Sequence, residues 1–325
     1  MDSSLIGEKG AEKVHEVILP VRSAREPETN AQHVTRSTAQ RDFPPGSEWL
    51  YLRLSGSIEK VDRAVIPQLP PLVDRFAQMG WIDSWHFLRY GEPSFHVRLR
   101  MHGDPALLSA HVYPEAVAAL GPVADLLEIG AYSRELERYG GDLGILIAES
   151  VFHLDSEFAL GTHSNLISRN ASTADRWLLA HAACWDVLVA ANWPEPRVSA
   201  VLAEAVSWAS LSRGGVLDWR SVAQAFRARQ GELLAAVQPD PNREGTIRES
   251  SSLKRRRELM SPLIGSLEEK LRPDKVDQVI IDFMHLSINR LLPWIDWGQE
   301  RAIYWNLHRL MGSVGSAQTP RLSGK

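Results

Sequence analysis

From about Gly144 onward the spacing of apolar residues is helical, whereas before it strand-like and helical runs are mixed, and this change constrains the fold more than any single motif does. Before it, short runs alternate like strands: Trp49 to Leu54 has leucines on one face and Trp49, Tyr51 and Arg53 on the other. After it, apolar residues recur at steps of three and four, which is the period of an amphipathic helix. The expected helices span residues 145–158, 174–191, 197–211, 216–236, 252–271, 275–292 and 295–311. The pattern predicts an α+β fold, with an N-terminal antiparallel sheet and flanking helices followed by a mostly helical C-terminal half.

The first part of the chain contains the signals for the sheet. Strands are expected at residues 49–54, 81–89 and 96–100. Gly91–Ser94 has the composition of a hairpin loop joining the last two strands. Helices are expected at residues 57–79, where internal prolines should kink or split the helix, and at 104–120. Residues 126–132 and 135–138 are expected to form another hairpin.

The chain divides into three segments by composition. Residues 1–41 are polar and are expected to be flexible, with an edge strand at 14–21. Residues 42–312 are expected to form one domain, sheet-rich over 42–141 and helical over 142–312, with a mobile loop near 238–251. Residues 313–325 are expected to be a loose tail.

Composition excludes several classes of protein. The net charge of −4 over 325 residues argues against a broad nucleic-acid-binding surface. A single cysteine, Cys184, excludes an intrachain disulfide, and its apolar context predicts a buried thiol. There is no run of 18 apolar residues and no apolar core of a signal peptide, so we expect a cytoplasmic protein without a membrane span. Neither metal-ligand spacing nor a glycine-rich phosphate loop is present, and we expect no metal and no cofactor.

The strand expected at 96–100 carries two arginines on one side. Its period of two places His96, Arg98 and Arg100 on one face and Val97 and Leu99 on the other. Because a strand rises about 3.3 Å per residue, the two guanidinium groups start about 7 Å apart. Planar, permanently charged groups at that spacing suit a carboxylate or a phosphate. The alternative is that this face is merely the solvated side of the sheet.

A charged run ends the sheet-rich part. Glu135 and Arg138 lie three residues apart and are followed by Tyr139-Gly140-Gly141. In a helical turn the two charges would share a face, whereas in a strand they would point to opposite sides. The paired glycines permit a backbone path that other residues rarely take. A charged cluster that leads into a tight turn favours a functional site.

Six landmarks occur in an order that resembles a known family. They are Pro45 to Tyr51, Phe87 to Tyr90, His96 to Arg100, Tyr132 to Gly141, Phe152 to Ser156 and His285 to Arg290. No single landmark is specific, but the ordered set, spread over residues 42–312, resembles the C-terminal elimination domain of lantibiotic dehydratases. It is similar to the free-standing form of this domain in thiopeptide-type bacteriocin biosynthesis.

The resemblance implies a lyase that removes glutamate from glutamylated Ser or Thr of a ribosomal precursor peptide, giving dehydroalanine or dehydrobutyrine. The functional positions of the family match five residues here: Arg98, Arg100, Glu135, Arg138 and His285. This sequence departs from the family in having Leu286 where methionine is frequent. The implied partners are a precursor peptide with its leader and a glutamylating enzyme that uses glutamyl-tRNA. A homodimer stays open, and no nucleic acid or membrane partner is implied.

The residue types fit this chemistry. Elimination takes the α-proton and expels a carboxylate, and glutamate carries a second carboxylate, so arginines can hold both anions. The ordinary pKa of an imidazole suits proton transfer by His285 at neutral pH. Glu135 either orients an arginine or acts as the base, and nearby arginines favour orientation. Two readings without a catalytic role remain: His285 as a core histidine, and Asn289-Arg290 as residues that cap a helix or pair within the helical half.

Two other functions compete with elimination. One is a thiopeptide pyridine synthase that joins two dehydroalanines by a formal [4+2] cycloaddition, a reaction with no departing glutamate to hold. The other is a non-catalytic scaffold that binds the leader peptide by adding it as a strand. Elsewhere, the basic run Lys254 to Arg257 is expected to be a solvated helix face, with an acidic partner as the alternative.

Overall fold

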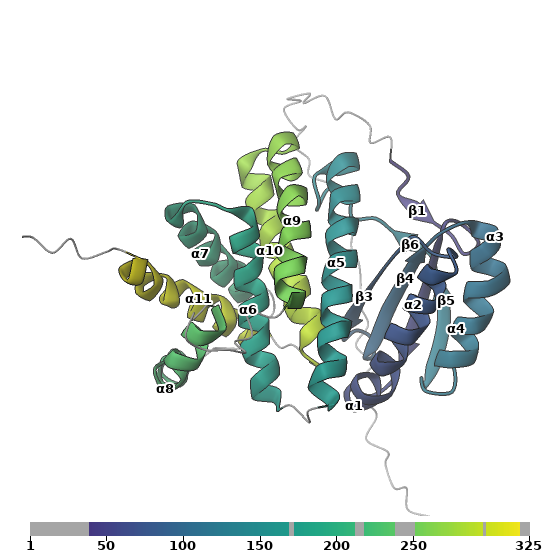
Figure 1. Cartoon of the computed structure of the whole chain (residues 1–325), viewed down its shortest axis with the longest axis horizontal. Coiled ribbons are helices and arrows are strands. Elements are labelled where there is room, and N and C mark those ends of the chain that lie inside the picture. Colours follow the sequence, from purple (N-terminus) through teal and green to yellow (C-terminus); the bar gives the residue numbers. More distant parts are fainter. Residues whose placement is uncertain (1–38, 169–171, 212–217, 238–250, 295–296, 319–325) are drawn as a thin grey trace, which may run out of the picture. The chain divides into compact units, whose positions relative to one another are not determined.

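The computed structural model describes residues 39–168, 172–211, 218–237, 251–294 and 297–318. The edge strand expected at 14–21 and most of the loop expected at 238–251 lie outside these residues. An antiparallel sheet comes first and long helices follow (Figure 1), which confirms the α+β class. Among the described helices, none is long and apolar enough to cross a membrane.

The main sheet has four antiparallel strands in the order β3-β4-β2-β5. They are β2 (Trp49–Ser55), β3 (Ser84–Tyr90), β4 (His96–His102) and β5 (Leu126–Gly130). The β3–β4 hairpin forms around Gly91–Ser94 as expected. The register sets Tyr51 opposite Arg100 and Arg53 opposite Arg98, so these four side chains share one face of the sheet.

The other face of the sheet packs into the main hydrophobic core. Val97 and Leu99 are fully buried there, together with Phe76 and Leu120 from the flanking helices. These helices form two irregular runs: α1 (Ile58–Lys60), η1 (Val61–Val65), η2 (Ile66–Gln68) and α2 (Leu69–Gln78), then α3 (Pro105–Leu107), η3 (Leu108–Val112) and α4 (Tyr113–Leu120). The first run changes winding around its prolines, as expected, because proline removes a backbone donor and fills the space of the preceding turn.

The hairpin expected from residues 126–132 and 135–138 is wrong. β5 instead pairs with β2, and β6 (Tyr132–Ser133) pairs with β1 (Asp42–Phe43) in a separate two-stranded sheet. The segment after β6 closes into a turn, in which the amides of Arg138 and Tyr139 donate to the carbonyl of Glu135 at 3.1 and 3.3 Å. Local hydrogen bonds therefore satisfy this backbone, and the charged residues share one side of the turn.

The helical part matches the expected pattern. Its members are α5 (Gly141–Ser168), α6 (Thr173–Ala191), α7 (Glu195–Leu211), α8 (Trp219–Val237), α9 (Ser251–Lys270), α10 (Pro273–Leu291) and α11 (Trp297–Gln318). Helix α5 is longer than expected at both ends, and α11 extends into the segment expected as a tail. Cys184 is buried in α6, as expected.

A buried ion-pair network ties α5, α6, α9 and α10 together. Arg256 is 2% exposed and lies 2.7 Å from Asp155 and 3.3 Å from Asp186. Arg290 binds the other oxygen of Asp155 at 2.6 Å. The expectation that the basic run forms a solvated face is therefore wrong for Arg256, because two carboxylates from neighbouring helices compensate its burial.

Side chains from α5 cover the outer edge of β3, where another strand would otherwise pair. The amide of Phe87 donates to Ser156 Oγ at 3.2 Å. His153 Nδ1 lies 3.0 Å from the carbonyl oxygen of Trp85. An uncovered edge would present a row of unpaired backbone groups, so these contacts both close the sheet and dock α5 on it.

Helix α10 completes this edge. The Asn289 amide accepts from the Arg89 backbone N–H and donates to its carbonyl, both at 2.8 Å. Arg290 Nε donates to the carbonyl of Phe87 at 2.9 Å. The reading of Asn289-Arg290 as contacts within the helical part is therefore incomplete, because both side chains also bind the sheet. Together the contacts fix the position of α10 relative to β3 and β4.

Replacing Ser156 by alanine should lower the free energy of unfolding by about 1–3 kcal/mol, because the buried amide of Phe87 then loses its acceptor. Ser150→Ala is the matched control: Ser150 is exposed on the same helix, and its hydroxyl donates to the Leu146 carbonyl. Urea denaturation followed by circular dichroism measures both variants. Equal midpoints for the two would contradict the edge-docking role of Ser156.

Candidate active site

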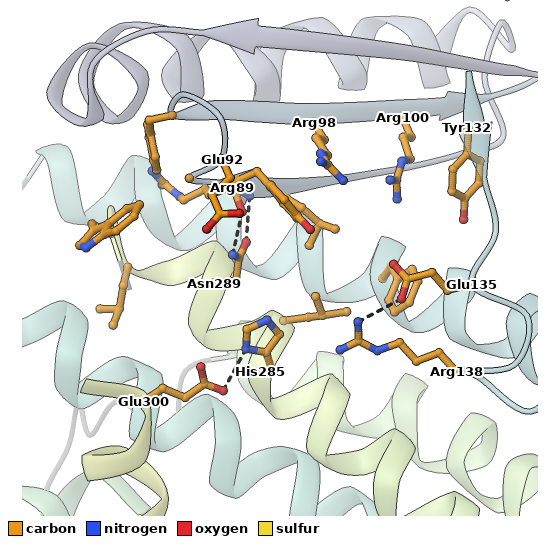
Figure 2. Close-up of a pocket in the computed structure, with 18 of the residues that line it drawn as sticks. Arg89, Glu92, Arg98, Arg100, Tyr132, Glu135, Arg138, His285, Asn289 and Glu300 are labelled. Atoms are coloured by element: carbon orange, nitrogen blue, oxygen red, sulfur yellow. Dashed lines mark hydrogen bonds and ion pairs between the residues drawn. The ribbon is translucent and has the colours of Figure 1, made fainter. Parts of the chain in front are cut away.

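A pocket of about 640 Å³ lies where the face of the sheet that carries the arginines meets the helices. It is lined by the β3–β4 hairpin, the turn after β6, and residues of α5, α7, α10 and α11. All five residues singled out in the sequence line this pocket: Arg98, Arg100, Glu135, Arg138 and His285. Figure 2 shows Arg98 and Arg100 extending from the sheet, with His285 and Arg138 on the side away from the strands. The structure therefore brings together groups that lie up to 187 positions apart in sequence (285 − 98 = 187).

Arg98 and Arg100 are held by aromatic rings and imidazoles. The Arg98 guanidinium lies 3.5 Å from the ring centre of Tyr90, and that of Arg100 lies 4.2 Å from the ring centre of Tyr132. Within the described part of the chain, neither arginine forms a salt bridge with a carboxylate. Both are half-buried, so the reading of this face as a solvated surface is wrong. The rings hold the two guanidinium groups in place without neutralising their charge.

Two neutral imidazoles help to orient these arginines. His96 Nδ1 donates to the carbonyl of Ser94 at 2.8 Å, which leaves Nε2 as the acceptor for Arg98 Nε at 3.2 Å. Arg100 Nη1 lies 3.3 Å from Nε2 of His86. Burial, with the nearby positive charge of Arg100, lowers the pKa of His86 well below its ordinary value. Burial also lowers the pKa of His96. Each ring therefore stays uncharged at neutral pH and accepts from its arginine.

Arg138 differs from the strand arginines because it is neutralised. Asp282 on α10 binds it in a bidentate pair, with distances of 3.0 Å to Nε and 2.7 Å to Nη2. Burial opposes the charge of Arg138, but the hydrogen bonds with Asp282 and the negative charge of the groups around it together raise the pKa of the guanidinium above its ordinary value. Glu135 adds one hydrogen bond at 3.0 Å. The bidentate orienting partner of Arg138 is therefore Asp282, which the sequence reading missed, and Glu135 supports it from the exposed side.

The turn before α5 gives Arg138 its position. Gly140 has a φ of +86°, and a Cβ atom there would lie 2.6 Å from Leu271. Only glycine combines this left-handed backbone with such a close approach. The tight turn brings the segment after β6 against the helical part, so that Arg138 meets Asp282.

His285 is paired with a carboxylate that the sequence reading also missed. Its Nδ1 lies 2.9 Å from Glu300 Oε1, and the fully buried Glu300 also accepts from the Tyr304 hydroxyl at 2.6 Å. A carboxylate accepts, so Nδ1 carries the proton and Nε2 is the basic nitrogen. His285 lines the pocket and 19% of its side chain is exposed, which argues against a purely structural core residue. Glu300 is an acidic residue in the first turn of α11, which is a common position for glutamate, so no local sequence pattern marks it as a functional residue.

Among the described residues, no group of three or more His, Cys, Asp and Glu side chains could hold a metal ion. The pocket lining instead includes four arginines, of which Arg89 is paired with Asp62, together with a His–Glu pair and several aromatic rings. This set can bind carboxylates, accept a proton at an imidazole, and stabilise the imidazolium that results.

Sequence comparison places this site in a family context. The model of the family described as "Lantibiotic biosynthesis dehydratase C-term" matches residues 49–311. The nisin biosynthesis protein NisB from Lactococcus lactis subsp. lactis is 23% identical over 313 residues, which cover 94% of this chain and 30% of that protein. The subtilin biosynthesis protein SpaB from Bacillus subtilis is 27% identical over 127 residues, which cover 37% of this chain and 12% of that protein.

Solved structures share the fold. The tRNA-dependent lantibiotic dehydratase MibB from Microbispora sp. 107891 has a TM-score of 0.62 at 24% identity, covering 84% of this chain and 29% of that one. TsrL has a TM-score of 0.61 at 16% identity, covering 83% of this chain and 95% of that one. The pyridine synthase TbtD from thiomuracin biosynthesis has a TM-score of 0.60 at 12% identity, covering 83% of this chain and 100% of that one.

The chain thus spans about 30% of the length of NisB and of MibB. The family match extends over most of the chain, from β2 into α11, and includes every residue of the pocket named above. The resemblance seen in the sequence is confirmed: this chain belongs to the family of lantibiotic biosynthesis dehydratase C-terminal domains.

Proposed function

We propose that this chain is a lyase that eliminates glutamate from glutamylated Ser or Thr residues of a precursor peptide, leaving dehydroalanine or dehydrobutyrine. The observation that carries this proposal is the pair Arg98 and Arg100, which face the pocket without a carboxylate partner among the described residues. A leaving group that departs as a carboxylate supplies the missing anion.

In the proposed reaction, His285 Nε2 accepts the α-proton of the esterified residue. The electron pair of that C–H bond forms the Cα=Cβ double bond while the Cβ–O bond breaks, and glutamate leaves with the electrons of the broken bond. Glu300 holds the imidazole in place and stabilises its protonated form. The proton then passes to solvent, which restores the base.

The arginines act on the departing glutamate. Negative charge grows on the ester oxygen as the Cβ–O bond breaks, so a guanidinium beside that oxygen stabilises the transition state more than the ground state. Arg138, whose own charge is balanced by Asp282 and Glu135, binds more weakly and suits the second carboxylate. Glu135 is assigned to orienting Arg138, because it already accepts a hydrogen bond from that guanidinium.

The proposed partners follow from this reaction. The substrate is a precursor peptide, and a separate glutamylating enzyme supplies its ester. Mass spectrometry of a Glu-esterified peptide mixed with the protein tests the proposal, with loss of one glutamic acid per site as the expected result. An unchanged ester would contradict it.

A second candidate is a pyridine synthase, favoured by one observation: TbtD matches the fold over its whole length. At 12% identity the likeness concerns the fold alone, and joining two dehydroalanines requires no carboxylate-binding pair. A peptide that contains two dehydroalanines separates the two functions, because only a synthase would convert it into a ring. The leader-binding scaffold rests on residues 14–21, which lie outside the described residues.

Arg98→Lys should lower kcat/KM for the esterified peptide about 10- to 100-fold, because lysine keeps the charge but loses the planar fork. The matched control is Arg53→Lys. Arg53 lies opposite Arg98 on the same face of the sheet, forms a salt bridge with Glu128 at 3.6 Å and does not line the pocket. Quantitative mass spectrometry of product formation measures both. Equal losses in the two variants would show that the sheet, and not the anion site, was disturbed.

Glu300→Gln should reduce kcat by about 10²-fold with little change in KM, because the amide cannot stabilise a protonated His285. Since Glu300 acts through the imidazole, the double variant with His285→Ala should be no slower than His285→Ala alone. Single-turnover rates of the three variants test this. Additive losses would show that Glu300 contributes to the reaction independently of His285.

A further inference from the structure

The pocket has two chemically different ends. Arg138 and Glu135 lie at one end, and Glu92 of the β3–β4 hairpin lies at the other, well separated from them in Figure 2. The hairpin end is built from aromatic and apolar side chains that neither transfer a proton nor bind the leaving group in the reaction proposed above. They are Tyr90, Phe95, Leu292, Pro293 and Trp294.

Trp294 has a defined position at this end. Its ring lies 5.8 Å from that of Phe95 in an edge-to-face arrangement. A Cβ atom on Gly91 would lie 2.8 Å from two carbons of the indole, so the absence of a side chain at Gly91 allows the ring to lie against the hairpin. Trp294 is nevertheless 43% exposed, which leaves part of a fixed aromatic ring uncovered.

Tyr90 is placed in a similar way and connects the two ends. The Arg98 guanidinium lies 3.5 Å from the centre of its ring, and Tyr90 is 43% exposed. A side chain bound against Tyr90 would thus lie next to the anion site. Large, rigid aromatic rings exposed on a pocket wall are the usual anchors for a ligand, since covering them removes apolar surface from water.

The volume of the pocket leaves room for such a ligand. About 640 Å³ falls inside the range of about 300–1,000 Å³ that encloses ligands of drug size, which are larger than one glutamyl ester. In a peptide, the group nearest to the esterified residue is the side chain of the residue beside it. A flat or bulky apolar side chain there would match the aromatic end.

We infer that the aromatic end of the pocket binds the side chain that flanks the esterified Ser or Thr, and that Trp294 makes the enzyme prefer an aromatic or large apolar neighbour. This inference rests on the proposed elimination reaction and adds a specificity-determining residue to it. Trp294 contacts the substrate peptide but takes no part in proton transfer.

The test uses two synthetic peptides that carry the same Glu-esterified Ser, flanked on both sides by Phe in one and by Gly in the other. The wild-type protein should eliminate glutamate from the Phe peptide with about tenfold higher kcat/KM, and Trp294→Ala should bring this ratio close to one by slowing the Phe peptide alone. Trp219→Ala is the matched control, because Trp219 is 39% exposed and lies outside this pocket; it should leave the ratio unchanged.

Gly91→Ala provides a second variant in case Trp294→Ala is unstable. The added methyl group would displace the indole, so the ratio should fall although the tryptophan is retained. Equal rates on the two peptides, or a ratio that survives Trp294→Ala, overturn the inference and leave the proposed reaction standing. Failure of the wild-type protein to eliminate from either peptide overturns both.

Discussion

Hydrogen bonds between helix side chains and the outer edge of β3 hold the molecule together at the point where the pocket forms. Ser156 and Asn289 take the places that a fifth strand would fill, so the sheet ends against helices. β4 pairs with β3 on the other side, which places Arg98 and Arg100 at a set distance from α10. This edge helps to align the strand-borne guanidinium groups with the helix-borne imidazole (Figure 2).

The cations of the chain fall into two groups with different consequences. Arg256 and Arg290 are buried with carboxylates and hold helices together. Removing either member of such a pair would leave a buried charge without its partner and lower the stability of the fold. Arg98 and Arg100 are supported by rings and neutral imidazoles, which orient them without cancelling their charge. Arg98 and Arg100 therefore keep the electrostatic potential in the pocket positive. Electrostatic attraction is stronger in such a partly desolvated space than in bulk water.

The sequence predicted correctly those features that depend on residues close to one another in the chain. The period of two in β4 fixed the side on which Arg98 lies, and the period of three and four identified the helices. The hairpin expected at Glu135 to Arg138 was wrong, and of the two forms left open for this segment the structure has the turn, which carbonyl hydrogen bonds and a glycine stabilise. Sequence reasoning also missed the roles of Arg256 and Glu300, because whether a charged side chain is buried depends on partners that other helices supply. One helix does not contain that information.

Helix α10 carries Asp282, His285 and Asn289 at steps of three and four residues, which places the partner of Arg138, the imidazole and the β3 contact along a single face. Each residue turns the helix by about 100°, so one inserted or deleted residue between Asp282 and Asn289 would swing part of this face away from the sheet. The geometry of the pocket therefore depends on this count of residues as well as on their identities. The spacing, more than any one amino acid, is the feature by which distant proteins with the same arrangement can be sought.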